Sequence, residues 1–454
     1  MKRLRIGIDG YNLALPNGTG IATYGFMLAQ ALRAMGHQVD GVFGLDVGRE
    51  PTVREAQFYD RLVRSAPASR AKRRIRRTFD TLGMMFGAQA LDVPTGQVVT
   101  TAFADRLPKF DRLVSYPRLF ERAHAYFRLT GRMATLRMAN PPDIMHWTYP
   151  IPVRLEGARN IYTIHDVVPL RLPFTTLDEK QGYKALVEAC IRAGDHICTV
   201  SEASRRDILA NFSVPPEKVA NTYQVSSMDQ ALLAEDPLDA ARAVEGIFGL
   251  RHRGYFLFFG AIEPKKNLGR LIEAYLSLGT ETPLVIVAGR SWQSERELLL
   301  LPREAEEAEP HHQHLVDRII RIDYLPRHLL MRLARGARAV TFPSLYEGFG
   351  LPAHEAMLLG APVLSSTTGS IPEIAGDAAL LADPYDVTAI ADALRRLDCD
   401  SDLRAKLAAC GPVQAQAFSM DRYRERLTIM YNQSMGLRDQ SADGREIGSD
   451  GHAG

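Results

Sequence analysis

Two glutamates lie eight positions apart in a segment, residues 343–355, that follows an apolar run and opens a helix. Glu347 falls in the turn and Glu355 about one turn into the helix, so both carboxylates can face one ligand at the end of a strand. Gly348 and Gly350 let a backbone approach a phosphate closely, and the N–H groups at a helix start attract one. The segment therefore predicts a diphosphate cradle flanked by two hydroxyl-binding carboxylates, although Glu-Gly-Phe-Gly alone would also fit an ordinary turn.

A pair of adjacent lysines supplies the charge that such a ligand needs. Lys265 and Lys266 lie in the turn at 260–267, again between a strand and a helix. Departure of a nucleoside diphosphate leaves negative charge, which two ammonium groups on a facing loop can neutralise without a metal ion. We expect Lys266 to be the main phosphate contact and Lys265 the second, the alternative being an inert exposed pair.

Two motifs of the N-terminal half follow predicted strands. Gly18 and Gly20 lie after the first strand but match the dinucleotide-binding fingerprint poorly, because its third glycine is missing and the loop is long. His165 and Asp166 end an apolar strand at the edge where α/β proteins bind ligands. A histidine at such a place either contacts the ligand or packs within the fold.

Weaker candidates come from other strand ends. His146 and Trp147 could line an acceptor cleft, and Ser201 follows another strand, whereas Glu373 reads as structural. The histidines at 311–314 lie in a polar stretch that is typical of an exposed loop. With no Asp-x-Asp pair in a suitable loop, the sequence predicts no metal site.

Short apolar runs alternate with helical patterns through most of the chain, which predicts βαβ units and mostly parallel sheets. Strands are expected at 5–9, 38–43, 144–147, 160–164 and 196–200, and a helix at 21–35. The pattern restarts at Tyr255, with further strands at 283–288, 318–322, 339–342 and 362–365.

A chain of 454 residues is too long for one hydrophobic core, so two α/β domains are expected. We place an N-terminal domain at 1–225, with a basic insertion at about 49–139, and a C-terminal domain at 226–415. A helix at 416–435 is expected to cross back to the first domain, before a disordered tail at 436–454.

Composition places the chain among ordinary globular proteins, with 46% hydrophobic and 24% charged residues and a net charge of +2. No segment reaches the roughly 18 uninterrupted apolar residues of a membrane span, and residues 6–15 lack the apolar run of a signal peptide. The four cysteines show no Cys-x-x-Cys spacing and are expected to be reduced thiols. These features predict a cytoplasmic protein.

Positive charge is concentrated in residues 61–137, which hold 16 Lys or Arg and 5 Asp or Glu, a net charge of +11. Aromatic and aliphatic residues are interleaved with it, and the densest run is 70–77. One interpretation is a solvated face, and the other is docking on anionic lipid or a lipid-linked phosphate at the cytoplasmic face of the inner membrane. Nucleic acid is not an expected partner, because no binding motif for it accompanies the charge.

Together these motifs resemble those of retaining glycosyltransferases of the GT-B type, in the E-x7-E family (family 4, group 1) that includes bacterial mannosyltransferases of polysaccharide and O-antigen assembly. The resemblance covers residues 141–434 well and the first 40 moderately, but not 49–139. It implies a GT-B fold, in which two Rossmann-like domains face each other across a cleft.

The resemblance also implies roles on the donor side. Glu355 should bind the ribose hydroxyls and Glu347 the sugar or its phosphate. The amides of Phe349, Gly350 and Leu351 should bind the diphosphate.

On the N-terminal side, the resemblance implies that the loop with Gly18 and Gly20 closes over the donor phosphates and sugar. His165, with Asp166, should contact the transferred sugar or the acceptor. The expected catalytic residues are His165, Lys266 and Glu347.

The reaction implied is transfer of a hexose from a nucleoside diphosphate to an acceptor hydroxyl with retention of configuration, by front-face attack and without a metal or other cofactor. GDP-mannose, or a mannose-derived deoxysugar such as rhamnose or perosamine, is the leading donor, ahead of UDP-sugars. The expected acceptor is a saccharide on polyprenyl diphosphate, in O-antigen or exopolysaccharide assembly. The alternatives are a sugar phosphorylase or nucleotide-sugar epimerase of the same fold, and a catalytically silent scaffold of an assembly complex at the membrane.

Overall fold

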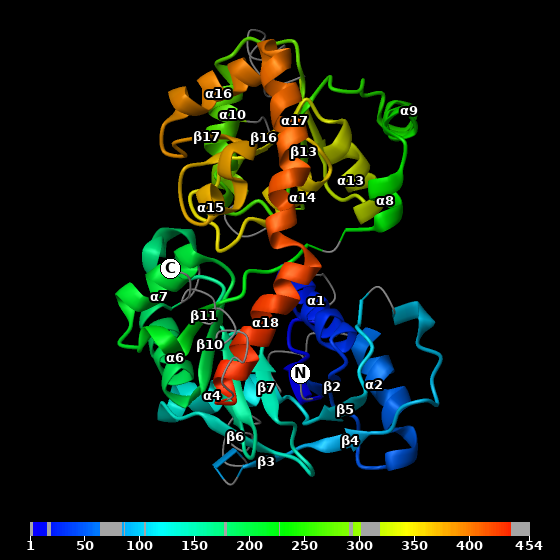
Figure 1. Ribbon diagram of the computed structural model, residues 1–454, viewed down its shortest axis with the longest axis vertical. Helices are drawn as coiled ribbons and strands as arrows, with labels where there is room; N and C mark the ends of the chain where they lie inside the picture. The colour runs from blue at the N-terminus through cyan, green and yellow to red at the C-terminus, as the bar shows by residue number, and fades with distance from the viewer. Residues whose placement is uncertain are drawn as a thin grey trace, which may run out of the picture.

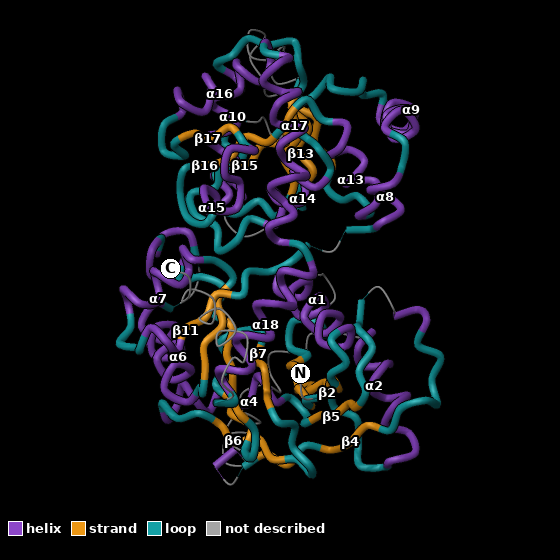
Figure 2. Tube along the Cα trace, viewed as in Figure 1, coloured by secondary structure: helices purple, strands orange, loops and turns teal. Residues whose placement is uncertain are grey.

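The computed structural model describes residues 3–15, 20–63, 84–85, 87–103, 106–176, 179–226, 228–289, 294–300 and 318–436. They form two α/β domains, with the N-terminal half below the C-terminal half in Figure 1. In each domain the strands gather at the centre and helices surround them (Figure 2). The predicted class, two Rossmann-like α/β domains, is confirmed.

The N-terminal sheet has eight strands. Their order across the sheet is β11 (Val219–Asn221), β10 (His196–Thr199), β9 (Arg159–Thr163), β7 (Ile144–Trp147), β1 (Arg5–Asp9), β2 (Gln38–Phe43), β5 (Arg112–Ser115) and β4 (Leu91–Val93). Only β4 is antiparallel to its neighbour. The chain order reverses between β1 and β7, so the loops after these two strands border the crevice where such sheets bind ligands.

The apolar runs predicted the bounds of β1, β2 and β7 to the residue, because these strands are buried almost throughout. The helices of this domain are α1 (Gly20–Ala34), α2 (Arg54–Val63), α4 (Leu119–Thr130), α5 (Val168–Arg171), α6 (Lys180–Ala193) and α7 (Glu202–Asn211). α1 buries Tyr24, Leu28 and Leu32, as their helical spacing predicts.

The segment 49–139 is more than the predicted insertion, because β5 and β4 complete the main sheet. Two further short strands, β3 (Ala88–Gln89) and β6 (Ala134–Arg137), join β8 (Val153–Leu155) in a three-stranded sheet. The missed strands β3, β4, β5 and β6 each hold at most two apolar residues, too few to be recognised as an apolar run in the sequence. The basic run at 70–77 lies outside the described residues.

The C-terminal sheet has six parallel strands. Their order is β14 (Ile319–Ile322), β13 (Leu284–Val287), β12 (Phe256–Phe259), β15 (Ala339–Phe342), β16 (Val363–Ser366) and β17 (Leu380–Ala382). Counted along the chain this is the Rossmann order 3-2-1-4-5-6, so the switch point lies between β12 and β15. The turns that carry the predicted lysines and glutamates therefore start from adjacent strands.

Nine described helices accompany this sheet. They are α8 (Gln230–Ala234), α9 (Pro237–Phe248), α10 (Leu268–Leu276), α11 (Ser294–Glu297), α13 (Arg327–Gly336), α14 (Leu351–Leu358), α15 (Ile371–Ala375), α16 (Val387–Cys399) and α17 (Ser401–Ala415). α8 and α9 pack against α13, so both belong with the C-terminal sheet.

The last helix, α18 (Met420–Ser434), runs back along the N-terminal domain and packs against α1 (Figure 1). The chain therefore crosses between the domains twice, and the crossings touch, since the rings of Tyr223 and Phe418 lie 5.1 Å apart. Buried side chains continue from α1 through α18 into the C-terminal domain as one cluster. In the described part of the chain no helix is long and apolar enough to cross a membrane.

A buried polar cluster fixes α18 to the N-terminal domain. The ring of His146 is fully buried, and its Nδ1 lies 2.7 Å from Oη of Tyr431 while its Nε2 lies 2.8 Å from Oγ1 of Thr163. Oη of Tyr24 lies 2.9 Å from the same threonine oxygen. Burial lowers the pKa of His146 to about 3, so the ring is neutral and has one donor and one acceptor for these partners.

We predict that Tyr431→Phe lowers the free energy of unfolding by about 1 to 3 kcal/mol, because it leaves a buried nitrogen of His146 without its partner. Urea denaturation followed by circular dichroism measures this change. Tyr385→Phe is the matched control, since Tyr385 is half exposed and keeps its ring under Arg270. Equal midpoints for the two variants would contradict the anchoring role of the cluster.

Candidate active site

The two charged turns of the C-terminal domain meet at the switch point of its sheet. One turn follows β12 and carries Lys265 and Lys266, and the other follows β15 and carries Glu347. The backbone N–H of Leu345 donates to the carbonyl oxygen of Lys265 at 2.8 Å, which joins the turns directly. Both therefore occupy the edge of the sheet where open α/β proteins bind ligands.

Lys266 and Glu347 form a nearly buried ion pair. Nζ lies 2.6 Å from Oε1, and the side chains are 15% and 11% exposed. Burial acts to raise the pKa of Glu347, but the ammonium groups of Lys266 and Lys265 outweigh it and lower that pKa below its ordinary value. Glu347 is therefore an anion that holds one lysine in place.

Lys265 is surrounded by carboxylates from both domains. Burial acts to lower its pKa, yet Asp166, Glu347 and Glu263 raise it above the ordinary value. Asp166 belongs to the N-terminal domain, where its Oδ1 also accepts from the N–H of Val168 at 3.0 Å. The ammonium group therefore stays charged, between carboxylates from the two sides of the cleft.

The second glutamate has a partner that the sequence did not indicate. Oε1 of Glu355, buried in α14, accepts from Nη2 of Arg327 at 2.7 Å. Burial raises the pKa of Glu355 and outweighs the lowering effect of Arg327. Arg327, the first residue of α13, is half exposed and belongs to no motif, so only the three-dimensional structure reveals the pair.

Packing and backbone conformation within the protein favour glycine at two positions of the turn after β15, Gly348 and Gly350. A methyl group at Gly348 would lie 2.5 Å from the carbonyl oxygen of His165, because this backbone presses against the other domain. Gly350 caps α14 with φ of 91°, a conformation that favours glycine. Between them, the buried ring of Phe349 packs on Phe418, with centroids 5.5 Å apart. The amides of Phe349, Gly350 and Leu351 thus stand at the start of α14, where helix N–H groups have no partner within the helix.

His165 lies at the cleft with a defined ring orientation. Its Nε2 donates to the carbonyl oxygen of Thr148 at 2.9 Å, and Tyr24 packs edge-on at a centroid distance of 4.8 Å. Burial lowers the pKa of His165, so the ring is neutral near pH 7 and Nδ1 carries the lone pair. Thr148 is held in turn by Asp9, whose carboxylate accepts from its N–H.

The glycine loop approaches the donor side from the N-terminal domain. A methyl group at Gly20 would lie 3.5 Å from Cδ1 of Leu351, so the start of α1 faces the start of α14. Gly18 lies outside the described residues.

Three candidates that the sequence placed at strand ends are buried within the fold. His146 is fully buried beneath α18 and bonded to Tyr431, and Trp147 stacks on Tyr162 in the core. Ser201 is the N-cap of α7, where its buried Oγ accepts from the N–H of Ser204 at 3.0 Å. Strand ends carry structural polar residues as well as ligand contacts, and sequence alone did not separate the two.

The loop after β16 supports Glu347 from behind. Both the N–H and the Oγ of Ser370 donate to the carbonyl oxygen of Glu347, at 3.2 and 3.0 Å. Gly369 has φ of 63°, and a methyl group there would lie 2.9 Å from the backbone of Glu347. This loop therefore fixes the position of the turn that carries Glu347.

Replacing Gly348 by alanine is predicted to destabilise the fold by about 1 to 3 kcal/mol, because the added methyl group would overlap the backbone of His165. Thermal unfolding tests this. Gly246→Ala is the control, since Gly246 lies in α9 with nothing within 4 Å of its added methyl group, and it should unfold no earlier than wild type. A Gly348→Ala protein as stable as the control would show that the domains do not meet at this point.

Comparison with known proteins agrees with this geometry. The sequence profile described as Glycosyltransferase Family 4 matches residues 96–221, and that described as Glycosyl transferases group 1 matches residues 249–412. The O-antigen chain mannosyltransferase B of Escherichia coli is 31% identical over 360 residues, which make up 76% of this chain and 89% of that protein.

Solved structures show the same fold at low identity. Sucrose-phosphate synthase from Thermosynechococcus elongatus matches with a TM-score of 0.63 at 18% identity, over 96% of this chain and all of that one. HepE of Anabaena, solved with UDP and glucose, matches with a TM-score of 0.60 at 14% identity, over 95% of this chain and all of that one. The architecture of two facing Rossmann-like domains is thus shared with solved structures. The chain belongs to the family 4, group 1 glycosyltransferases and has the GT-B fold.

Proposed function

We propose that this glycosyltransferase moves a hexose from a nucleoside diphosphate to a saccharide hydroxyl with retention of anomeric configuration and without a metal ion. The observation that carries the proposal is the buried Lys266–Glu347 pair, with Lys265 beside it, at the switch point of the donor-side sheet. Such an arrangement offers fixed charge to a departing diphosphate.

Each residue of the turn has a task in this reaction. The diphosphate lies between Lys266 and the N–H groups of Phe349, Gly350 and Leu351 at the start of α14. Glu355 accepts hydrogen bonds from the ribose hydroxyls, and Arg327 holds that carboxylate in place. Glu347 orients Lys266 and contacts the sugar.

Transfer proceeds on the front face of the sugar. The bond between the anomeric carbon and the phosphate oxygen breaks, and the acceptor oxygen forms a bond to the same face. The acceptor proton moves to the departing phosphate oxygen, whose charge Lys266 and the helix start stabilise. Neutral His165 contacts the sugar or acceptor through Nδ1, and Asp166 lies beside it.

The donor is GDP-mannose or a mannose-derived deoxysugar such as rhamnose or perosamine. The supporting observation is similarity to a protein named as an O-antigen chain mannosyltransferase. The acceptor is a saccharide carried on polyprenyl diphosphate, in O-antigen or exopolysaccharide synthesis at the cytoplasmic face of the inner membrane. The net charge of +11 in residues 61–137 favours contact with such an anionic surface.

Lys266→Met and Glu347→Gln are each expected to lower kcat about 100-fold or more. The first removes the positive charge that stabilises the departing diphosphate, and the second removes the carboxylate that holds this lysine in place. Transfer to a saccharide acceptor is measured with EDTA present throughout, and wild-type activity should persist there. NMR of the product reports the anomeric configuration.

Lys406→Met is the matched control, since Lys406 is exposed on α17, far along the chain from both turns. It should transfer sugar at the wild-type rate. Undiminished transfer by either site variant in a folded protein would refute the assignment, and product formed only with orthophosphate as acceptor would favour a phosphorylase.

The donor base is tested by thermal shift. GDP-mannose at 100 times its Kd should stabilise the protein by about 2.7 kcal/mol, since only the folded state binds it. UDP-, ADP- and dTDP-sugars at the same concentration should shift the midpoint less. A larger shift with a UDP-sugar would replace the guanosine assignment, and no shift with any of them would count against a nucleotide-sugar site.

A further inference from the structure

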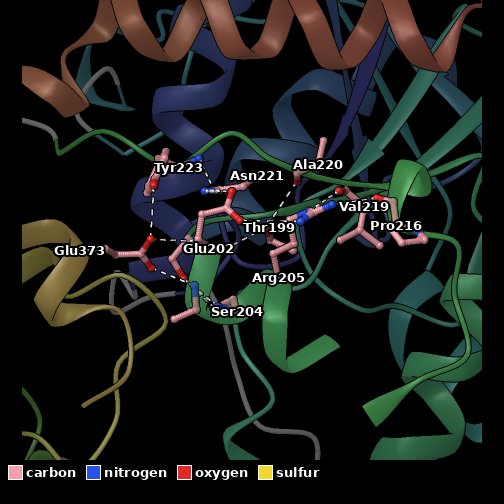
Figure 3. Close-up of polar contacts among 12 residues, drawn as sticks. Thr199, Glu202, Ser204, Arg205, Pro216, Val219, Ala220, Asn221, Tyr223 and Glu373 are labelled. Atoms are coloured by element: carbon pink, nitrogen blue, oxygen red, sulfur yellow. Dashed lines mark hydrogen bonds and ion pairs between the residues drawn. The ribbon is translucent and has the colours of Figure 1, made fainter. Parts of the chain in front are cut away.

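Glu373 links the two domains through the first turn of a helix. It lies in α15 of the C-terminal domain, yet its carboxylate accepts from two backbone N–H groups of α7 in the N-terminal domain (Figure 3). Oε1 accepts from Ala203 at 2.9 Å and Oε2 from Glu202 at 3.1 Å. Oε2 also accepts from Oη of Tyr223 at 3.3 Å.

This contact completes a helix start that the N-terminal domain caps only in part. Ser201, the N-cap, accepts from the N–H of Ser204, so the N–H groups of Glu202 and Ala203 depend on a partner from outside the helix. A carboxylate is the best such partner, because the helix dipole is positive at this end. The carboxylate of Glu202 itself is turned to Nδ2 of Asn221, at 3.0 Å (Figure 3).

The surroundings of Glu373 are consistent with a charged contact. Tyr223 lies in the first crossing between the domains, and burial, followed by the charges of Glu373 and Glu202, raises its pKa to about 12. Its hydroxyl therefore stays protonated and donates. The guanidinium of Arg426 in α18 lies over the same ring, 4.6 Å from the centroid.

The same segment reaches the catalytic turn. Three residues before Glu373, Ser370 holds the carbonyl oxygen of Glu347 with two hydrogen bonds. From α7, Oγ of Ser204 donates to the carbonyl oxygen of His165 at 2.6 Å. Contacts thus connect the turn of Glu347 with the segment of Glu373, that segment with α7, and α7 with His165.

A second contact of α7 joins the same turn. Oη of Tyr346, next to Glu347 in the chain, donates to Oδ2 of Asp207 at 2.6 Å. Asp207 lies near the middle of α7. The helix therefore meets the C-terminal domain at its start, through Glu373, and near its middle, through Asp207.

We propose that Glu373 is a positioning residue for sugar transfer: by capping α7 from the opposite domain, it sets the closed arrangement in which His165 and Glu347 face the same ligand. The role in transfer rests on the proposed function, whereas the role in closure does not. Glu373 itself touches neither donor nor acceptor.

The test uses Glu373→Gln, which keeps the shape of the side chain and removes its charge, and Asp377→Asn as the matched control. Asp377 is an exposed carboxylate four residues further along the chain. Small-angle scattering of the full chain, with and without GDP, should give a larger radius of gyration for Glu373→Gln than for wild type or control. This scattering measurement does not depend on transfer activity.

Kinetics supply the second reading. At a temperature well below unfolding, Glu373→Gln should lower kcat about tenfold while the KM for the nucleotide sugar changes less than about twofold, because the donor binds to one domain and only closure is impaired. A purely structural cap would lower the midpoint of thermal unfolding without this split. Tyr223→Phe, which removes one of the three bonds, should give a smaller fall in kcat and serves if Glu373→Gln does not fold.

The readings separate the two proposals. Scattering of Glu373→Gln that equals wild type with and without GDP would overturn the closure role, whatever the activity. A larger radius with unchanged kcat would overturn the positioning role. If wild type transfers no sugar while scattering still changes, the proposed function fails and the closure role stands.

Discussion

Two adjacent ammonium groups in a nearly buried turn repel one another, and the structure around the cleft is arranged to counter that repulsion. Glu347 neutralises Lys266 from the next turn of the same sheet, at 2.6 Å. Lys265 keeps its charge because carboxylates surround it, one of them Asp166 from the other domain. Burying charges is costly unless each is compensated, so this site depends on the N-terminal domain even though the donor is expected to bind to the C-terminal one.

The two domains are also in close contact through their backbones beside this site. Gly348 lies against the carbonyl oxygen of His165, where a side chain would not fit, and Gly20 faces Leu351 on the other side of the cleft. The protein therefore brings its two halves together through backbone as well as through charge. Backbone contact leaves little room for change, which explains why the turn is rich in glycine.

The sequence predicted many of the elements and the positions of the two charged turns well, because their signals are local. Apolar runs predicted the first and last residues of β1, β2, β7 and β15. The sequence also predicted that Glu347 lies in the turn after a strand and Glu355 in the helix that follows. The parallel order then brought the lysine turn beside them, as the switch-point rule requires.

Residues whose role depends on distant partners were not predicted. His146 and Ser201 looked like ligand contacts because they end strands, but their partners are a tyrosine of α18 and the first turn of α7. Arg327 carries no motif, and its partner lies 28 positions away. Glu373 was predicted to be structural, but its partners on α7, about 170 positions away, were not. The strands β4 and β5 were missed because each holds only two apolar residues, too few to form a recognisable apolar run.

Both chain crossings pack against α14, the helix for whose start we propose diphosphate binding. Phe418 from the second crossing contacts Phe349, and Ser226 from the first lies 2.7 Å from Nδ1 of His354. A change in backbone conformation at the crossings would therefore be transmitted to Phe349, whose amide is one of those proposed to bind the diphosphate. By thermodynamic reciprocity, a ligand bound at the start of α14 would change the preferred angle between the domains as strongly as that angle changes the affinity for the ligand. Ligand binding and domain orientation would then be coupled.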